Sequence, residues 1–261
     1  MSELGAVFAR CRDEDRAALV AYLPAGYPTQ HDSELAVTTL AESGADIIEV
    51  GVPYTDPLMD GPVIQDAADT ALRAGFRFAG LFRCVEAARA AGAVPVVMSY
   101  WNPVLRYGPD RFAAHLSAAG GSGLITPDLI PDEAAVWTSA ARTHGVDPIF
   151  LVAPSSTDER LAMTTAACGG FVYAASTMGV TGARTAVGGG ARVLVDRTRA
   201  VSDLPVCVGL GVSTGDQAAE VAAFADGVIV GSALVAALRD DSTREGLRAL
   251  TEELAQGVRR R

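Results

Sequence analysis

Short apolar runs rich in β-branched residues alternate along this chain with longer segments in which apolar residues recur at helical spacing. Each short run is apolar almost throughout, which is typical of a parallel strand that is buried on both faces. The pattern therefore predicts strands at residues 18–23, 46–51, 94–100, 122–127, 147–154, 170–176, 204–211 and 226–231.

The segments between these runs carry signals for the start of helices. Ser156, Ser213 and Ser242 each stand three residues before an acidic residue, which is the spacing of a capping box. Pro131 suits the first turn of a helix, where a backbone N–H is not needed. A helix is therefore predicted after each strand.

Eight strands, each followed by a helix, predict an α/β fold of the (β/α)8 TIM-barrel type. An open, doubly wound sheet is the alternative. Two additions to the barrel are expected: a helix at the N-terminus, and a helix over 62–75 that precedes the expected one at 78–91. Because no Pro-, Gly- or Ser-rich linker divides the chain, residues 1–261 are predicted to form a single domain.

The composition argues against several classes of protein. A formal net charge of −10 counts against sequence-independent binding to nucleic acid or to an anionic membrane. No apolar run approaches the ~18 residues of a membrane span, and the N-terminal segment lacks the apolar centre of a signal peptide. The four Cys and three His show no zinc-type spacing, so a cytoplasmic protein without a metal is expected.

All 21 basic residues are arginine, and no lysine occurs. This excludes any chemistry that the protein would perform through its own lysine amine. A Schiff-base aldolase lysine, an internal pyridoxal-phosphate lysine and a P-loop lysine are all ruled out.

Candidate chemistry begins at the end of the second predicted strand, because the functional loops of such a barrel follow the carboxyl ends of its strands. Glu49 shares one face of that strand with Ile47 and Gly51, and we expect it to point into the barrel mouth. Partial desolvation there raises the pKa of a carboxyl group and suits it to proton transfer near neutral pH. The alternative is a strand-end Glu paired with an arginine at the rim.

The loop after this strand holds two aspartates, Asp56 before Pro57 and Asp60 before Gly61. Asp is favoured in turns and at helix caps, which is an alternative explanation for either residue taken alone. Their position directly after a strand that ends in Glu favours a functional role, because carboxylates in unlike environments can divide acid and base work.

Glycine-bearing segments follow the last three predicted strands. Gly211 with Ser213, and Gly231 with Ser232, are candidates for a phosphate site built from backbone N–H groups at helix N-termini, which recurs after strands seven and eight of such barrels. The segment 177–190 has the length and glycine content of a mobile lid. Ordinary turns and a disordered loop are the alternatives.

Residues near the strand ends could line an apolar pocket of the kind that takes a small aromatic substrate. Most residues at such positions serve only packing, which is the alternative for each of them. The candidates are Tyr22, Tyr100, Leu124, Phe171, Tyr173 and Leu210.

Several strings of the sequence resemble the tryptophan synthase alpha chain family, in the family's order and over almost the whole length. The most specific is E-x-G-x-P-x-x-D-P-x-x-D-G-P, which begins at Glu49. The matching strings are YLPAGYPT (22–29), DIIEVGVPYTDPLMDGPVIQDA (46–67), MSYWNP (98–103), LITPDLIPDE (124–133), GVTGAR (179–184), GLGVS (209–213) and ADGVIVGSALV (225–235).

The resemblance implies a (β/α)8 barrel and a carbon–carbon lyase of tryptophan biosynthesis. Such a lyase cleaves indole-3-glycerol phosphate to indole and D-glyceraldehyde 3-phosphate. It also implies a partner beta chain that holds pyridoxal phosphate and receives the indole, in an alpha2beta2 heterotetramer. The alpha chain itself is then expected to carry no metal and no organic cofactor.

The family's catalytic Glu falls on Glu49 and its catalytic Asp on Asp60. In the family's mechanism the indole ring is protonated at its C3 atom and the carbon–carbon bond to the glycerol substituent then breaks, so no lysine is needed. The resemblance makes Glu49 the acid at C3 and the base at the glyceryl hydroxyl, and it places Asp60 at the indole N–H. It also places Tyr22 and Tyr173 in the aromatic pocket, Thr181 on the lid, and the phosphate site on Gly182, Gly211, Gly231 and Ser232.

The sequence departs from the family's pattern at Tyr54-Thr55, where Phe-Ser is commoner, and at Tyr22, where Phe is commoner. Each added phenol hydroxyl needs a hydrogen-bond partner in an apolar pocket. The tail of the lid, residues 185–190, is rich in glycine.

Three other functions stay open. A free-standing indole-3-glycerol phosphate lyase would turn over without a partner, whereas the partner-facing loop candidates 53–59 and 100–108 favour an alpha chain. A non-catalytic subunit that binds phosphate ligands and regulates a partner would not need Glu49 and Asp60. Another barrel phosphate enzyme is the last alternative, either a sugar-phosphate isomerase or an indole-3-glycerol phosphate synthase, whose general-acid lysine is absent here.

Overall fold

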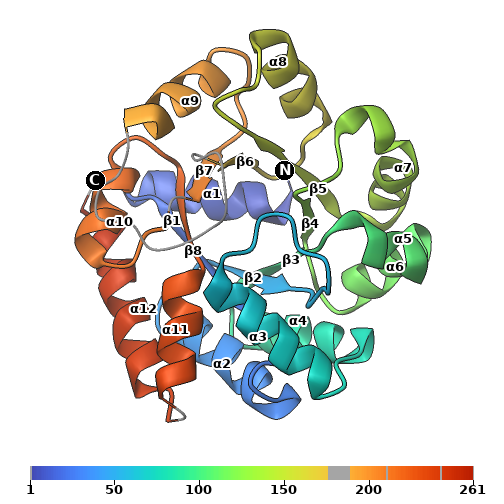
Figure 1. Ribbon diagram of the computed structural model, residues 1–261. Helices are drawn as coiled ribbons and strands as arrows, with labels where there is room; N and C mark the ends of the chain where they lie inside the picture. The colour runs from blue at the N-terminus through green and yellow to red at the C-terminus, as the bar shows by residue number, and fades with distance from the viewer. Residues whose placement is uncertain (1, 176–188, 210, 242, 261) are drawn as a thin grey trace.

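Eight parallel strands close into a barrel in which the last strand pairs with the first. The computed structural model describes residues 2–175, 189–209, 211–241 and 243–260. Figure 1 looks along the barrel, with the helices arranged around the strands. The closed order confirms the predicted TIM barrel and excludes the open sheet. The strands are β1 (Ala18–Pro24), β2 (Ile47–Gly51), β3 (Val94–Met98), β4 (Gly123–Thr126), β5 (Asp147–Val152), β6 (Val172–Ala175), β7 (Val206–Gly209) and β8 (Gly227–Val230).

Helices lie between successive strands and cover the outside of the barrel. The two predicted additions are present, one before the first strand and one in the long interval after the second. Pro131 opens the short 3-10 helix, as its position in the sequence indicated. The helices are α1 (Glu3–Asp13), α2 (Gln30–Glu42), α3 (Pro62–Arg73), α4 (Phe78–Ala90), α5 (Trp101–Tyr107), α6 (Pro109–Ala118), η1 (Pro131–Glu133), α7 (Ala135–His144), α8 (Asp158–Ala167), α9 (Gly189–Arg199), α10 (Gly215–Ala222), α11 (Ser232–Asp240) and α12 (Glu245–Gly257).

The predicted strands coincide with the observed ones to within two residues at either end, but the predicted helix caps need correction. Helices α8 and α10 are capped by Thr157 and Thr214, each one residue after the predicted serine, and each hydroxyl accepts a backbone N–H at 3.2 Å. Ser156 is not the cap because its hydroxyl accepts a bond from the N–H of Ala153 in the preceding turn. Ser242 lies outside the described residues.

Side chains alternate along each strand between the barrel interior and the layer beneath the helices. In β2, Ile47 belongs to the interior cluster, whereas Ile48 and Val50 belong to the outer layer. Glu49 therefore points into the barrel, as predicted. The register supports this, because Glu49 lies beside Tyr22 of β1 and beside an interior valine of β3.

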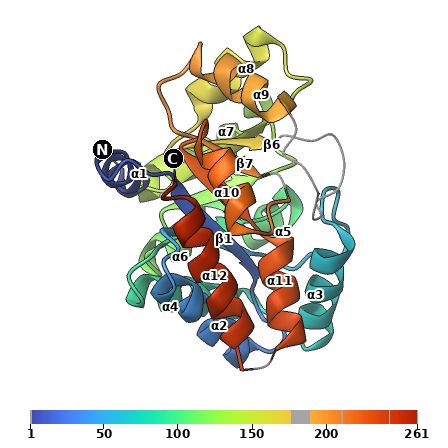
Figure 2. The same ribbon diagram turned by 90° about the vertical axis from the view of Figure 1, so that its left-hand side faces the viewer.

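Helix α1 closes one end of the barrel. Its buried face includes Leu4, Val7 and Phe8, and the Phe8 ring packs edge-on against Phe171 with 5.7 Å between ring centroids. Figure 2 shows α1 at one end of the molecule and the segment between β2 and α3 at the other. The carboxyl ends of the strands are therefore free to form a site.

A buried ion pair stabilises the closed end. Arg16 and Asp46 are 6% and 8% exposed, and the guanidinium donates to both carboxylate oxygens at 2.7 and 2.9 Å. The same carboxylate accepts the backbone N–H of Leu19 at 3.0 Å. The pair thus links the segment just before β1 to the residue just before β2.

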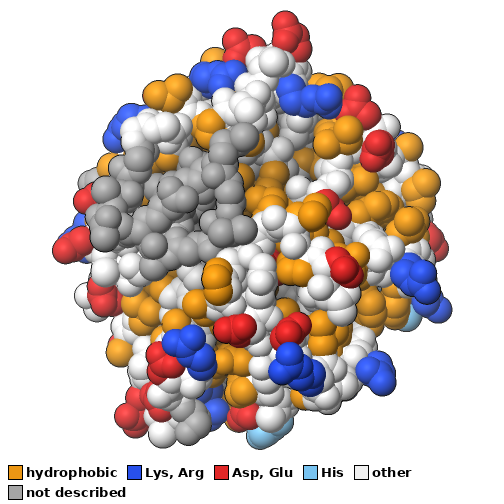
Figure 3. Space-filling view, in the orientation of Figure 1, with side chains coloured by type: hydrophobic (Ala, Val, Ile, Leu, Met, Phe, Trp, Pro, Cys, Tyr) orange, Lys and Arg blue, Asp and Glu red, His pale blue; other side chains and the backbone are white. Residues whose placement is uncertain are grey.

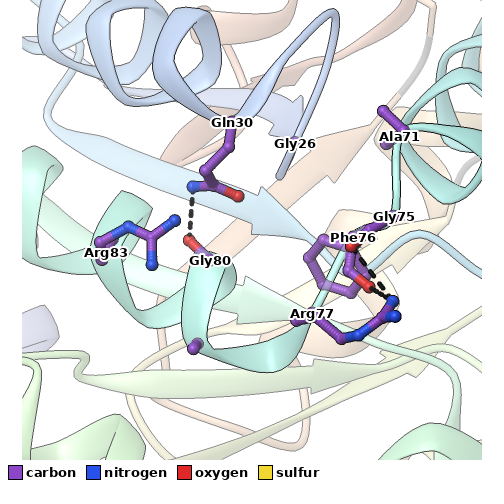
Figure 4. Close-up of a pocket in the computed structure, with 10 residues that line it drawn as sticks. Gly26, Gln30, Ala71, Gly75, Phe76, Arg77, Gly80 and Arg83 are labelled. Carbon is purple, nitrogen blue, oxygen red and sulfur yellow. Dashed lines mark hydrogen bonds between the residues drawn. The ribbon is translucent and has the colours of Figure 1, made fainter.

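A hollow of about 290 Å³ lies outside the barrel, where the ends of α2, α3 and α4 meet. In Figure 4 the Gln30 amide donates to the Gly80 carbonyl at 2.9 Å, and Arg77 turns back to the carbonyls of Gly75 and Phe76. The lining residues include no carboxylate. This hollow is thus separate from the predicted chemistry.

Candidate active site

The two predicted catalytic carboxylates lie close together at the carboxyl ends of the strands. Glu49 stands near the end of β2, and Asp60 ends the segment that leads into α3. Burial of the Asp60 carboxyl raises its pKa, and the charge of Asp60 contributes to a raised pKa at Glu49. The structure therefore brings these two residues together as the sequence predicted.

Glu49 is buried and unpaired. It is 1% exposed, and its Oε2 atom has no hydrogen-bond partner among the described residues. Desolvation, with a smaller contribution from the charge of Asp60, raises the pKa of Glu49 to about 8. No arginine of the described residues pairs with it, so the alternative of a rim ion pair is not what the structure shows. A carboxyl group in this state carries a proton at neutral pH and can donate it.

Asp60 is partly buried, and an aromatic residue holds it. The Tyr100 hydroxyl donates to Asp60 Oδ1 at 2.8 Å and accepts the Met59 N–H at 3.0 Å. Burial raises the pKa of Asp60, and the hydrogen bond from Tyr100 opposes that rise. The N-cap of α3 is Gly61, and no cap bond from a side chain is formed there, so Asp60 is not serving as a helix cap. Asp56 is exposed and accepts a bond from Thr55.

Two further tyrosines form walls beside the carboxylates. A Cβ atom at Gly51 would lie 2.3 Å from the Tyr22 hydroxyl, and one at Gly209 would lie 2.6 Å from the Tyr173 hydroxyl. Glycine at these two strand ends therefore makes room for the phenols. Burial raises the pKa of both tyrosines, and the charges of Glu49 and Asp60 add to this, which places all of these groups around one space.

The predicted lining at β4 needs correction. Leu124 pairs with Val97 in the register and belongs to the outer layer beneath the helices, whereas Ile125 belongs to the interior cluster. The run 122–127 has no charged residue to mark which face is inside. Its sequence alone therefore does not show that Ile125, and not Leu124, points into the barrel. Phe171 lies against α1, at the opposite end of the barrel. Leu210 lies outside the described residues.

Other interior residues escaped the sequence prediction. Met98 and Leu151 are half-buried and pack against the interior cluster, as Tyr173 does. At the surface, the exposed Asp128 accepts the first N–H of α5, that of Trp101, at 2.9 Å. The signal that could have indicated Met98 is the alternation of side chains along a strand. Met98 pairs with Gly51 of β2, and Gly51 shares the inward face of Glu49.

The predicted phosphate residues lie at the same end of the barrel. Gly231 is the N-cap of α11 and Ser232 its first residue, and this helix has no cap bond from a side chain. A Cβ atom at Gly231 would lie 3.4 Å from the Tyr22 ring, so the start of α11 adjoins the aromatic wall. Gly211 has a φ of +68°, which favours glycine. Thr181 and Gly182, with most of the predicted lid, lie outside the described residues.

Two features are absent from the described part of the molecule. No group of three or more His, Cys, Asp or Glu residues there is placed to hold a metal ion. No helix there is both long enough and apolar enough to cross a membrane.

Known proteins resemble this chain over its full length. A family model described as tryptophan synthase alpha chain matches residues 8–259. The tryptophan synthase alpha chain of Mycobacterium avium (strain 104) is 62% identical over 260 residues, which cover 100% of this chain and 96% of that protein. The alpha chain of Mycobacterium tuberculosis (strain ATCC 25177 / H37Ra) is 63% identical over 258 residues, which cover 99% and 95%.

Solved structures agree with the sequence relatives. A structure of Mycobacterium tuberculosis tryptophan synthase in space group F222 matches with a TM-score of 0.95 at 62% identity, and the match covers 99% of this chain and 98% of that one. The tryptophan synthase subunit alpha of Legionella pneumophila str. Paris matches with a TM-score of 0.89 at 30% identity, covering 99% and 98%. The chain belongs to the tryptophan synthase alpha chain family.

Proposed function

We propose that this protein is a tryptophan synthase alpha subunit, a lyase of tryptophan biosynthesis that cleaves indole-3-glycerol phosphate to indole and D-glyceraldehyde 3-phosphate. The observation that carries the proposal is a buried Glu49, with no ion-pair partner among the described residues, that faces Asp60 between tyrosine walls. A proton donor and an anion in unlike surroundings are what the cleavage requires. Family membership supports the same reaction.

Glu49 moves the protons of this reaction. Its carboxyl group gives a proton to the C3 atom of the indole ring, which turns the ring into an electron sink. The resulting carboxylate takes the proton of the glyceryl hydroxyl next to the ring. The bond between C3 and the glycerol substituent breaks, its electron pair restores the aromatic ring, and the hydroxyl carbon becomes the aldehyde. One residue thus serves as acid and base in turn, and no lysine or external reactant is consumed.

Asp60 accepts the indole N–H and stabilises the positive charge that the protonated ring carries. Because Asp60 is partly desolvated and held by Tyr100, its carboxylate acts in surroundings where an ionic interaction is stronger than in water. Tyr22, Tyr100 and Tyr173 are proposed to enclose the ring. The phosphate is proposed to bind backbone N–H groups at Gly231 and Ser232, with Gly211, Gly182 and the lid residue Thr181 completing that site.

The pH dependence of kcat/KM is expected to be bell-shaped. Activity rises with pH as Asp60 ionises and falls as Glu49 loses its proton, with the alkaline limb at a pH of about 8. Asp60→Asn removes the charge that contributes to the raised pKa of Glu49, so the alkaline limb of its residual activity is expected to move to lower pH. The measurement is kcat/KM for indole-3-glycerol phosphate across the pH range in both proteins. An unmoved alkaline limb would show that the two groups are not coupled.

A partner beta chain is proposed to bind at the carboxyl ends of the strands. Figure 3 shows hydrophobic groups gathered on this face, over α5, α6 and α7. Four large apolar residues are exposed in the loops and helices that follow β2, β3 and β4: Leu58, Leu105, Ile130 and Val136. Exposed apolar residues that gather on one face mark interaction sites.

We propose that the partner holds pyridoxal phosphate and receives the indole in a cytoplasmic alpha2beta2 complex, and that the alpha subunit itself holds no cofactor or metal.

Leu58→Asp is expected to weaken binding of a beta chain at least tenfold, because Leu58 is 71% exposed in the free subunit and a charge buried at an apolar contact lacks a partner. Val193→Asp is the matched control, since Val193 is also exposed but lies on α9, on another part of the ring. Sedimentation of each variant mixed with a beta chain gives the affinity. Equal binding by the two variants would place the partner elsewhere.

The test of the proposed function is indole release from indole-3-glycerol phosphate by the pure protein, alone and with a beta chain. Slow release alone and fast release with the partner is the expected result. Fast release by the protein alone would favour the free-standing lyase. Binding of the substrate without release, even with the partner present, would favour a non-catalytic regulatory subunit.

A further inference from the structure

We infer that the Tyr54 hydroxyl and the Asn102 carboxamide form a positioning pair that holds the Tyr100 ring, and through it the Asp60 carboxylate, in place for cleavage. The inference rests on the proposed function and assigns a role to a residue at which the sequence departs from the family's commoner Phe. The pair joins the loop after β2 to the first turn of α5.

The first contact joins the Tyr100 hydroxyl to the Asp60 carboxylate. The Tyr100 hydroxyl donates to Asp60 Oδ1 at 2.8 Å, and the N–H of Met59 donates to the same hydroxyl oxygen at 3.0 Å. The phenol therefore binds both the Asp60 carboxylate and the backbone that precedes it. A shift of the Tyr100 ring would change the direction from which Asp60 is held.

The second contact is at the ring. The Tyr54 and Tyr100 rings pack with 5.4 Å between centroids and an interplanar angle of 35°. The Tyr54 hydroxyl accepts a hydrogen bond from Asn102 Nδ2 at 3.1 Å. Tyr54 is thus fixed at its far end by a residue only two positions beyond the tyrosine against which its ring packs.

The hydroxyl of Tyr54 supplies what phenylalanine could not. Phenylalanine would keep the ring contact but leave the β2–α3 loop without this hydrogen bond to Asn102. The start of α5 is held independently, because Asp128 accepts the Trp101 N–H at 2.9 Å. Asn102 therefore keeps its position on α5 whether or not Tyr54 has a hydroxyl. Removing that hydroxyl makes the β2–α3 loop more mobile and leaves α5 in place.

The groups that face Asp60 make its position testable. Besides Tyr100, it interacts electrostatically with Glu49 of β2, Tyr22 of β1 and Tyr173 of β6. The Tyr100 hydrogen bond lowers the pKa of Asp60 against the effect of burial. Loosening that bond would therefore move the acid limb of the pH profile to higher pH, which a general loss of packing would not do.

The test is a set of steady-state measurements of indole-3-glycerol phosphate cleavage by the complex with a beta chain. Tyr54→Phe and Asn102→Ala are each expected to lower kcat about fivefold, the effect of one lost hydrogen bond, with KM within about twofold of wild type. Both should move the acid limb of kcat upward in pH. The double variant should be no slower than either single one.

The deciding comparison is made in a Tyr100→Phe background. If Tyr54 acts through Tyr100, adding Tyr54→Phe to Tyr100→Phe lowers kcat no further. Tyr27→Phe is the control for loss of a tyrosine hydroxyl, since Tyr27 lies in the loop after β1 beside Asp32 and Arg239. Urea unfolding of every variant separates positioning from loss of folded protein.

Three outcomes would overturn the inference while wild-type cleavage stands: full activity of Tyr54→Phe, a loss of equal size in the Tyr100→Phe background, or a fall in kcat without a shift of the acid limb. Absence of cleavage by the wild-type complex would instead overturn the proposed function. The two failures are therefore distinguishable.

Discussion

Glu49→Gln is expected to lower kcat for indole-3-glycerol phosphate cleavage about a thousandfold or more, since one group supplies both the acid and the base step. The amide keeps the size of the carboxyl group but can neither give nor take the proton. Indole release with a beta chain present measures the loss. Glu159→Gln, on the exposed side of α8, is the control and should retain wild-type activity.

The same substitution is expected to stabilise the fold at neutral and alkaline pH. The ordinary pKa of the carboxyl is 4.5 and its folded value is about 8, so the folded state holds the proton more tightly than the unfolded state does. Wild-type stability therefore falls as pH rises from the first value to the second. Glutamine does not ionise, so the advantage of Glu49→Gln grows over that interval to a few kcal/mol, on the order given by linkage.

Urea unfolding at pH 5 and pH 8 tests this expectation. The free-energy difference between Glu49→Gln and wild type should be small at the lower pH and clearly in favour of the variant at the higher. In the cleavage assay, a kcat of Glu49→Gln within about tenfold of wild type would show that Glu49 is not the acid and base of the reaction. A stability difference that does not change with pH would show that Glu49 is not buried as an unpaired acid.

Asp46→Asn is expected to destabilise the protein by about 2–3 kcal/mol, because the buried Arg16 guanidinium loses one of its two carboxylate partners and keeps only Glu14, at 2.6 Å. Arg16 would keep its charge in a site where only 6% of the residue is exposed. The Leu19 N–H would also face a weaker acceptor. The free energy of unfolding in urea is the measurement.

The matched control is an exposed pair on α3. Arg73 and Asp69 form an ion pair of 3.0 Å, but they are 81% and 56% exposed. Water and salt screen such a pair, so Asp69→Asn should have a much smaller effect than Asp46→Asn. Equal losses in the two variants would mean that burial does not set the strength of the Arg16–Asp46 interaction.

Local pattern was sufficient for the architecture and for the inward direction of one candidate catalytic residue. A parallel strand covered on both faces must be apolar on both, so eight such runs identified eight strands. Within β2 (Ile47–Gly51), Glu49 is the single charged residue, and its apolar neighbours Ile48 and Val50 indicated which face lies beneath the helices. The direction of Glu49 could therefore be predicted and is observed.

The same reasoning failed where no residue distinguished the two faces. Leu124 and Ile125 are neighbours of equal apolar character, and the choice between them depends on pairing with Val97 and Met98 of β3. A strand's register is a property of two segments, and a single run of sequence contains only one of them. The caps of α8 and α10 lie one residue after the predicted serines because each serine hydroxyl has another partner in the fold: Ser156 accepts the Ala153 N–H, and Ser213 donates to Gln217 Oε1.

The sequence by itself determined the barrel, the position of Glu49 at a strand end and the presence of two carboxylates after β2. Only the tertiary structure decided that Glu49 Oε2 has no partner in the described part of the chain, that Tyr100 holds Asp60 from 40 residues away, and that the Tyr54 hydroxyl has Asn102 as its partner. Strand formation follows from residues within a few positions of each other. Desolvation and hydrogen bonding between loops depend instead on which distant segments the closed barrel brings to one end.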